Sequence, residues 1–372
     1  MERKLYLTDA ELTASRGNIP ALNGLRAISI LIVTISHMGL QQQIPGWFGV
    51  NVFFFLSGFL ISRLLIAERE KFQSINIRLF YLRRFFRLFP ALLCLLLCCI
   101  VISLAQGVHI KYYAVISVIF YFANYVRIFA PDALQQLHLL HTWSLSIEEH
   151  FYFIYPLLLT FCFSRRLSVI PFIFLGIVLA FVFRMIDHFW FPSFATVYVY
   201  NASETRMDFL LFGALAAFIC HGSHARTFLR IVSDVRVFGA AIVLLISTFM
   251  IKSPIFRDVF RFTLQNVALL VVVPSLVFGE KYLIFKRILN HPVMDWIGRI
   301  SYSLYLFQVP VFEVIDDWAL TWPLASPFNV LAGYGLGFGL SFAAAAISYY
   351  FVEGPVLVWR RRLQRGVVEG VA

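Results

Sequence analysis

An arginine and a histidine interrupt the first long apolar stretch of the sequence, residues 22–40. A charged side chain in hydrocarbon is costly unless it has a partner or a task. Arg26 and His37 are eleven residues apart, which places them on one face of an α-helix and about 16 Å apart along its axis. A neutral imidazole is a suitable general base for a hydroxyl group, and a guanidinium binds phosphate or carbonyl oxygens. Alternatively, Arg26 reaches the headgroups and His37 caps the helix end.

A second group of cations lies in the string "YLRRFFRLFP", residues 81–90. Arg84 and Arg87 are three residues apart, so they are neighbours on a helix face, and Arg83 adds a third positive charge. Guanidinium groups bind phosphate oxygens through paired hydrogen bonds, which favours a site for a phosphorylated cofactor. The alternative is an amphipathic helix at the membrane surface whose cations meet anionic lipid.

A third group lies in "HLLHTWSLSIEEHFYFIYP", residues 138–156. Glu148 and Glu149 begin an apolar stretch, and a nearby serine could cap that helix. Two carboxylates together with His141 and Trp143 exceed what a cap requires. We expect a carboxylate here to orient His37, as the third member of a catalytic relay does.

Weaker candidates follow later in the chain. Arg206 and Asp208 stand at the entrance of an apolar stretch, where they either pair with each other or pair with other helices. Tyr302, Tyr305 and Glu353 are weaker still. The five cysteines all lie in apolar stretches without zinc-ligand spacing, so we expect no metal site.

The elements that must position these residues are membrane helices. Of the 372 residues 60% are hydrophobic and only 14% are charged, whereas a soluble domain carries about a quarter charged residues. The net charge of +11 fits positively charged cytoplasmic loops and anionic lipid better than nucleic acid. We predict an all-α integral membrane protein with about ten spans: 22–40, 47–67, 88–105, 144–163, 168–187, 205–220, 237–251, 262–278, 297–314 and 328–351.

Residues 112–129 form an ambiguous eleventh stretch. If they crossed the membrane, the basic tail "WRRRLQRG" would lie outside and the acidic segment "EVIDDW" inside, against the positive-inside rule. We therefore expect a re-entrant or interfacial segment there and both termini in the cytoplasm. No linker or repeat divides the chain, which predicts a single membrane domain over 1–372, with its core at about 22–355 and no additional soluble domain. No cleaved signal peptide is expected.

The order of these motifs resembles the acyltransferase 3 family, bacterial multi-pass membrane O-acyltransferases. The resemblance rests on "LNGLRAISILIVTISH", "GWFGVNVFFFLSGFLI", "RRFFRLFP", "HTWSLSIEEHFYFIYP", "RMDFLLFGALAA", "GRISYSLYLFQVP" and "YYFVEGP". It implies transfer of an acyl group, usually acetyl, from cytoplasmic acyl-CoA to a carbohydrate hydroxyl, at the bacterial inner membrane. Arg26 and His37 match an essential motif of the family, and Arg84 and Arg87 match one implicated in donor handling.

The sequence also departs from the family pattern. Asn23 and Asn51 stand where an acid is usual, His150 where a glutamine is usual, and Gln308 where a histidine is usual. The change at position 308 argues against a catalytic role there, and the change at position 23 leaves the partner of Arg26 open.

The resemblance implies that different residues bind the acyl donor, catalyse the transfer and bind the acceptor. The acyl-CoA nucleotide would bind Arg83, Arg84 and Arg87, and its pantetheine arm would pass Arg26. His37 would be the base, with Glu148 or Glu149 to orient it. The carbohydrate or glycolipid acceptor would meet a set of polar and aromatic side chains: Trp143, His141, Arg206, Asp208 and Tyr302.

Two readings from other classes compete with this one. A transporter or flippase for a sugar or lipid would also use ionisable groups within the membrane. Such proteins often show inverted repeats and broken spans, and neither is visible here. A membrane scaffold without catalytic activity would have no use for these groups. The sequence leaves the oligomeric state open.

Overall fold

The computed structural model describes residues 20–40, 43–319 and 328–359, and these residues form helices and connecting turns without any strand. The predicted all-α class is confirmed. The basic residues after Trp359 and both chain ends, on which the cytoplasmic placement of the termini depends, lie outside the described residues.

Six described helices are long and apolar enough to cross a membrane. They are Ala21–Leu40 (α2 with η2), Gly46–Phe72 (α3), Ile77–Ala105 (α4), Ile170–Trp190 (α9), Phe256–Phe278 (η4 with α15) and Phe328–Trp359 (α18 with η5). A seventh is obtained if α12 (Asp208–His221) and α13 (Ala225–Val232), which meet at a bend of 117°, count as one broken span. The chain is a multi-pass membrane protein, but the expected count of about ten spans is not confirmed.

The remaining predicted spans differ in length or polarity. The apolar helix α14 (Val235–Met250) has only 16 residues. The longer helices α8 (Trp143–Ser164) and α17 (Pro292–Ala319) carry acidic residues within their length. Residues 112–129 break into α5 (Tyr112–Ile119) and α6 (Ala123–Phe129), separated by Tyr121 at a φ of +58°. Neither piece is long enough to cross a bilayer, and their re-entrant or interfacial placement stays a prediction.

The chain divides into two compact units, each assembled from separate segments. Unit 1 comprises Met1–Ser29, Phe48–Ile75 and Ile147–Gly298, and unit 2 comprises Ile30–Trp47, Asn76–Ser146 and Arg299–Ala372. The remaining helices of unit 1 are α10 (Pro192–Asn201), α11 (Ser203–Arg206) and α16 (Leu283–Leu289). Unit 2 also contains α7 (Pro131–Gln135) and the 3-10 turn η3 (Leu140–Thr142).

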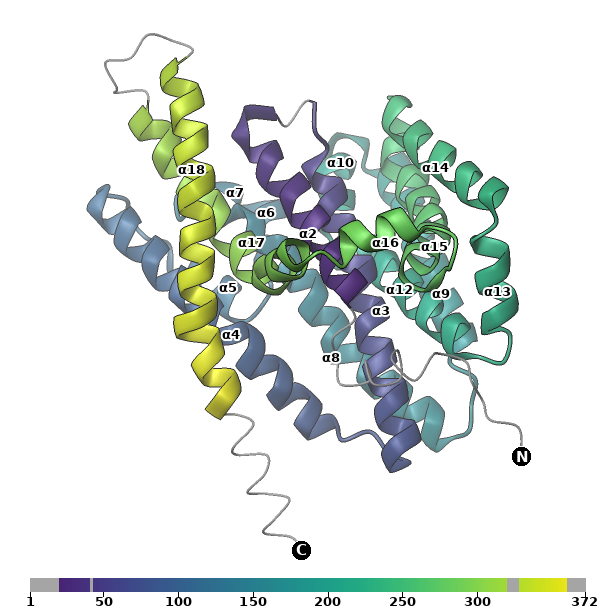
Figure 1. Ribbon diagram of the computed structural model, residues 1–372. Coiled ribbons are helices and arrows are strands. Elements are labelled where there is room, and N and C mark those ends of the chain that lie inside the picture. The colour runs from purple at the N-terminus through teal and green to yellow at the C-terminus, as the bar shows by residue number, and fades with distance from the viewer. Residues whose placement is uncertain (1–19, 41–42, 320–327, 360–372) are drawn as a thin grey trace, which may run out of the picture. The chain divides into compact units, whose positions relative to one another are not determined.

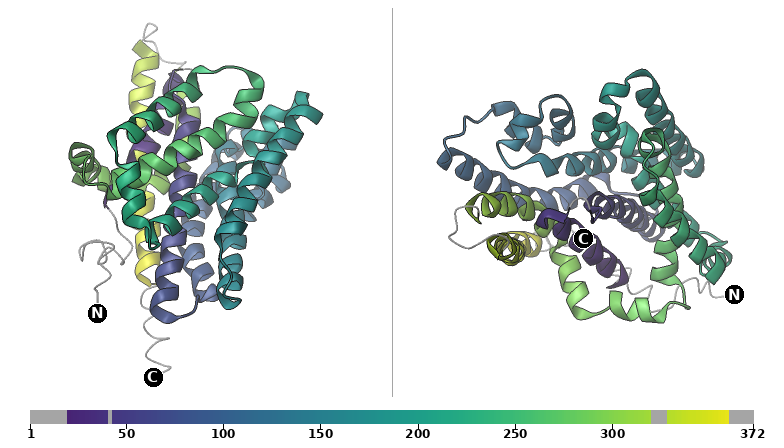
Figure 2. Two further views of the ribbon diagram at one scale, coloured as in Figure 1. Left: turned by 90° about the vertical axis from the view of Figure 1, so that its right-hand side faces the viewer. Right: turned by 90° about the horizontal axis from the view of Figure 1, so that it is seen from above.

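Close helix contact organises unit 1. A Cβ atom on Gly58 of α3 would lie 1.9 Å from the carbonyl oxygen of Leu210, and one on Gly213 of α12 would lie 2.0 Å from that of Phe55. The two backbones therefore touch, as small residues allow in membrane helices. α14 and α15 (Arg261–Phe278) lie side by side as a hairpin (Figure 1), and Figure 2 shows these green helices from two further directions.

In unit 2, α4 begins at a capped turn, because the side chain of Asn76 accepts a hydrogen bond from the backbone N–H of Leu79. Further along, α4 packs beside the turn η5 (Ser348–Glu353) at the end of α18 (Figure 1). In that turn the buried carboxylate of Glu353 accepts a hydrogen bond from Ser303 of α17. Glu353 therefore ties two helices together.

Candidate functional site

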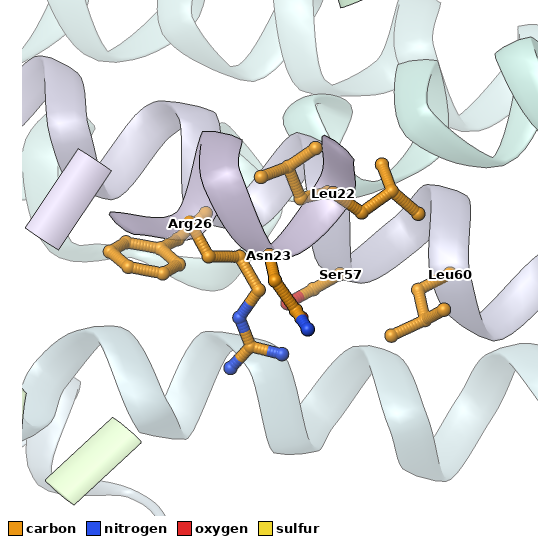
Figure 3. A pocket seen from close by; sticks show the side chains of 7 residues that line it. Leu22, Asn23, Arg26, Ser57 and Leu60 are labelled. Atoms are coloured by element: carbon orange, nitrogen blue, oxygen red, sulfur yellow. The ribbon is translucent and has the colours of Figure 1, made fainter. Parts of the chain in front are cut away.

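Arg26 lines a small cavity in unit 1 of about 30 Å³. Figure 3 shows Arg26 and Asn23 extending from α2 (Pro20–Ile35) in the same direction, with Ser57 of α3 beside them. The rest of the lining is apolar: Leu22, Phe53, Leu56 and Leu60. A cavity of this size holds a few water molecules at most. The polar side chains that line the cavity beside Arg26 are therefore those of Asn23 and Ser57.

Two carboxylates bind the polar neighbours of Arg26. The side-chain amide of Asn23 donates to Oδ1 of Asp295 at 2.8 Å. The hydroxyl of Ser57 donates to Oε1 of Glu148 at 3.0 Å. Asp295 of α17 thus places a carboxylate one hydrogen bond away from Asn23. Glu148 belongs to the surroundings of this cavity through Ser57.

Arg206 and Asp208 do not pair with each other. Asp208 forms a fully buried ion pair with Arg184, at 2.8 Å between Oδ2 and Nη1. Arg184 also donates to the carbonyl of Thr205 and to the hydroxyl of Thr263. The sequence analysis did not select Arg184. The only signal in the sequence was a charged residue within an apolar helix.

Arg206 is completely buried and donates to the side-chain oxygen of Asn51. Its guanidinium carbon lies 4.0 Å from the ring centroid of Phe262, within cation–π range. Asn51 in turn donates to Gln265 at 3.0 Å. Asn51 therefore binds an arginine through a neutral amide, and this network favours a structural role for Arg206.

His37 lies just past the end of α2, in the wide turn Ser36–Leu40 (η2). Its ring nitrogen Nδ1 lies 2.8 Å from the carbonyl oxygen of Val33. A carbonyl oxygen only accepts hydrogen bonds, so Nδ1 carries the proton and Nε2 has the free lone pair. The imidazole is thus held in the tautomer that a general base requires.

The turn changes the expected relation between Arg26 and His37. The regular α-helix that contains Arg26 ends at Ile35, before His37. The backbone angles of Met38 and Gly39 are not helical, and Gly39 has a φ of +72°. The unit boundary also falls between Ser29 and Ile30, so Arg26 belongs to unit 1 and His37 to unit 2. A passage shared by both residues stays a prediction.

His141 and Trp143 belong to unit 2, as His37 does. The ring of His141 is edge-on to that of Tyr305, with centroids 5.7 Å apart, and it interacts electrostatically with His37. Burial and the neighbouring His37 lower the pKa of His141 to about 3. Trp143 is buried, with the guanidinium carbon of Arg127 5.6 Å from its ring centroid.

An acidic residue that sequence reasoning did not select also belongs to this group. Oε2 of Glu313 lies 2.5 Å from Nδ1 of His138, and the side-chain oxygen of Gln106 lies 3.2 Å from Nε2 of the same ring. Both ring nitrogens therefore face acceptors, which favours the charged imidazolium form. Glu313 also interacts electrostatically with His37. Within unit 2, Glu313 is the acid that acts on His37, whereas Glu148 and Glu149 lie in unit 1.

The three arginines of the second motif lie half-buried on α4 in unit 2. The guanidinium carbon of Arg84 is 5.8 Å from the ring centroid of Phe80. Phe85 and Phe89 stack at 4.7 Å on the same helix. Tyr302 donates to the carbonyl of Leu88, next to Arg87. Cations and aromatic rings alternate here, an arrangement suited to either a nucleotide or a lipid headgroup.

The described residues contain no group of three or more His, Cys, Asp or Glu side chains that could hold a metal ion. Three described histidines each lie against one acid instead: His138 with Glu313, His188 with Asp258 and His221 with Glu70. One such pair that the sequence did not reveal joins His188 to Asp258, at 3.1 Å in unit 1.

Comparison with known proteins matches residues 19–350 to a family model described as "Acyltransferase domain". Among curated proteins, the chain is 30% identical over 357 residues to the O-acetyltransferase OatA of Staphylococcus aureus strain NCTC 8325 / PS 47. The protein of the same name in strain COL is equally similar. Each alignment covers 91% of this chain but only 57% of the relative. No solved structure matches the chain.

Proposed function

Because this chain belongs to the acyltransferase 3 family, we propose that it is a membrane O-acyltransferase that moves an acyl group, usually acetyl, from acyl-CoA to a carbohydrate hydroxyl. The relatives named O-acetyltransferase support the reaction class. The observation that carries the proposal is the tautomer of His37, whose hydrogen bond to Val33 leaves Nε2 free to accept a proton.

His37 acts as the general base in this proposal. Its Nε2 removes the proton of the acceptor hydroxyl while that oxygen attacks the acyl carbonyl, and the resulting imidazolium then protonates the leaving thiolate. A positioned base contributes about 10²–10⁴-fold to such a reaction. Glu313 stabilises the positive charge that develops on the ring, because it interacts electrostatically with His37 within the same unit.

The donor binds through the arginines. Arg83, Arg84 and Arg87 on α4 hold the nucleotide phosphates, since guanidinium groups bind such oxygens by paired hydrogen bonds. Arg26 binds a polar group of the pantetheine arm at its cavity. Of the two adjacent glutamates, Glu148 is the better candidate for a role near Arg26, because its partner Ser57 lines that cavity.

Trp143, His141 and Tyr302 remain the candidates for acceptor contacts. Arg206 and Asp208 fit a different role, because each is fully buried and bonded to other parts of unit 1. We propose that these two residues support the fold of the catalytic domain. The bacterial inner membrane is the proposed location, with the acyl donor at the cytoplasmic face.

The test is acyl transfer by purified protein in detergent. Wild-type protein, acyl-CoA labelled in the acyl group and a panel of oligosaccharides are incubated, and labelled products are identified by mass. We expect an ester on one acceptor, and a loss of about 10²–10⁴-fold in the His37→Ala variant. His109→Ala, at an exposed histidine, is the matched control and should retain wild-type activity.

The same experiment distinguishes an acyltransferase from a transporter or flippase. A transporter or flippase gives no covalent product in detergent, whatever the acceptor. Wild-type activity in His37→Ala would show that the base lies elsewhere.

A further inference from the structure

His141 is a buried histidine whose two ring nitrogens form no hydrogen bond with the described residues. Its residue exposure is 6%, and neither ring nitrogen has a hydrogen-bond partner among the described residues. The carbonyl of Leu306 faces the ring but lies outside normal hydrogen-bond geometry. Buried polar groups are nearly always bonded, and an unbonded one in a native structure requires an explanation. A ligand atom that arrives during the reaction would supply the missing partner.

The ring is nevertheless held firmly. The hydroxyl of Tyr305 donates to the backbone carbonyl of His141 at 2.9 Å, and it lies 2.6 Å from the hydroxyl of Ser144. The ring of Tyr305 also packs against the edge of the imidazole at an interplanar angle of 68°. An unbonded side chain fixed at both backbone and ring is preorganised, which is what stabilisation of a transition state requires.

The charge state of His141 differs from that of an ordinary surface histidine. With a pKa of about 3, the ring is neutral throughout the physiological range. A neutral imidazole carries one N–H donor and one acceptor nitrogen. His37, which acts electrostatically on His141 within the same unit, has its lone pair at Nε2, so unit 2 supplies both a base and a neutral donor.

We propose that His141 donates its ring N–H to the carbonyl oxygen of the acyl group during transfer. This inference rests on the proposed function. The acceptor oxygen forms a bond to the carbonyl carbon, its proton passes to Nε2 of His37, and the carbonyl electron pair moves onto the oxygen that His141 binds. When the tetrahedral intermediate collapses, the C–S bond breaks and the thiolate takes the proton from His37. A neutral imidazole is a known donor to such oxygens.

Gln308 offers a second donor of the same kind. It is completely buried, and neither atom of its side-chain amide has a partner among the described residues. It stands three residues after Tyr305 on α17, so the two are neighbours on the helix surface. The side chain of Gln308 thus offers an N–H donor without adding a second base.

The experiment compares His141→Phe and His141→Gln with wild type in the transfer assay. We expect His141→Phe to lower kcat by about 10²–10³-fold, the usual effect of removing one such donor, with the KM values for both substrates nearly unchanged. His141→Gln keeps a neutral N–H and should recover part of the loss. The thermal unfolding temperature of His141→Phe should equal or exceed that of wild type, because an unbonded polar group has been removed.

Several outcomes would overturn the inference. One is a normal kcat in His141→Phe, and another is a change confined to KM, which would indicate ground-state binding. Equal losses in both variants, together with a lower unfolding temperature, would indicate a structural role. If the wild-type protein transfers acyl groups and the His141 variants give one of these results, only the role of His141 is rejected. If the wild-type protein transfers no acyl group, the proposed function is rejected, and the role of His141 with it.

Discussion

In unit 1 the guanidinium of Arg184 uses its two terminal nitrogens on Asp208, Thr205 and Thr263, whereas in unit 2 both ring nitrogens of His141 remain without a partner. Both side chains are buried. The Arg184 network joins α9, α11, α12 and α15, which is a use of buried charge within the fold. The imidazole of His141 contributes nothing comparable. Buried atoms without a described partner also occur in unit 1, on Asn266 and at Nε of Arg184, so His141 is assigned to the reaction by its electrostatic interaction with His37 as well.

The largest effect is expected where the scaffold loses a charge. Asp208→Ala leaves the guanidinium of Arg184 buried without its counter-ion, and breaking such a pair costs about 3–5 kcal/mol. Thermal unfolding in detergent measures this loss. The double variant Arg184→Met with Asp208→Leu removes both charges and should recover most of the stability. If Asp208→Ala unfolds at the wild-type temperature, the Arg184 network is not part of the scaffold.

A second test of the scaffold concerns helix contact. Gly213→Ala places a methyl group where the backbone of α3 lies, and overpacking of this kind costs about 1–3 kcal/mol. Gly239→Ala on α14 is the matched control, because nothing lies within 4 Å of its added Cβ. The control should be neutral or slightly stabilising. Equal unfolding temperatures for the two variants would contradict the close contact of α3 and α12.

The variant Gln308→Leu tests whether the unbonded buried amide of Gln308 takes part in acyl transfer. Removal of an unbonded buried amide should leave the unfolding temperature unchanged or higher. A hydrogen bond between neutral groups contributes about 1 kcal/mol, so the transfer rate should fall about fivefold. Stability and initial rates are measured on the same preparation. A lower unfolding temperature would place Gln308 with the scaffold.

The smallest effect is expected from Glu313→Gln. The substitution removes the negative charge that acts on His37 but keeps the shape and an acceptor for His138. Because the Glu313 side chain is 37% exposed, solvent weakens this interaction, and we expect kcat to fall only about two- to fivefold. Glu280→Gln, at an exposed carboxylate in the other unit, is the control for loss of a carboxylate. An unchanged kcat in Glu313→Gln would remove Glu313 from the mechanism.

The sequence predicted the helical class because long apolar runs and few charges leave a chain little choice in a bilayer. The expected count of about ten spans is not confirmed, since several apolar runs break or shorten at local features such as Tyr121 and Met207. Arg26, His37 and the arginines of α4 were identified by their types and spacing. Their partners could not be identified, because contacts such as Glu313 with His138, 175 residues apart, depend on tertiary packing.

The turn that holds His37 has one more consequence. Because α2 stops helical geometry at Met38 and Gly39, the imidazole lies in the final turn, where backbone carbonyls point outward without helical partners. The carbonyl oxygen of Val33, at the negative end of the helix dipole, lies 2.8 Å from Nδ1 of the ring. Under the proposed function, the carbonyl groups at this helix end offset part of the cost of burying the positive charge that the ring gains when it takes a proton.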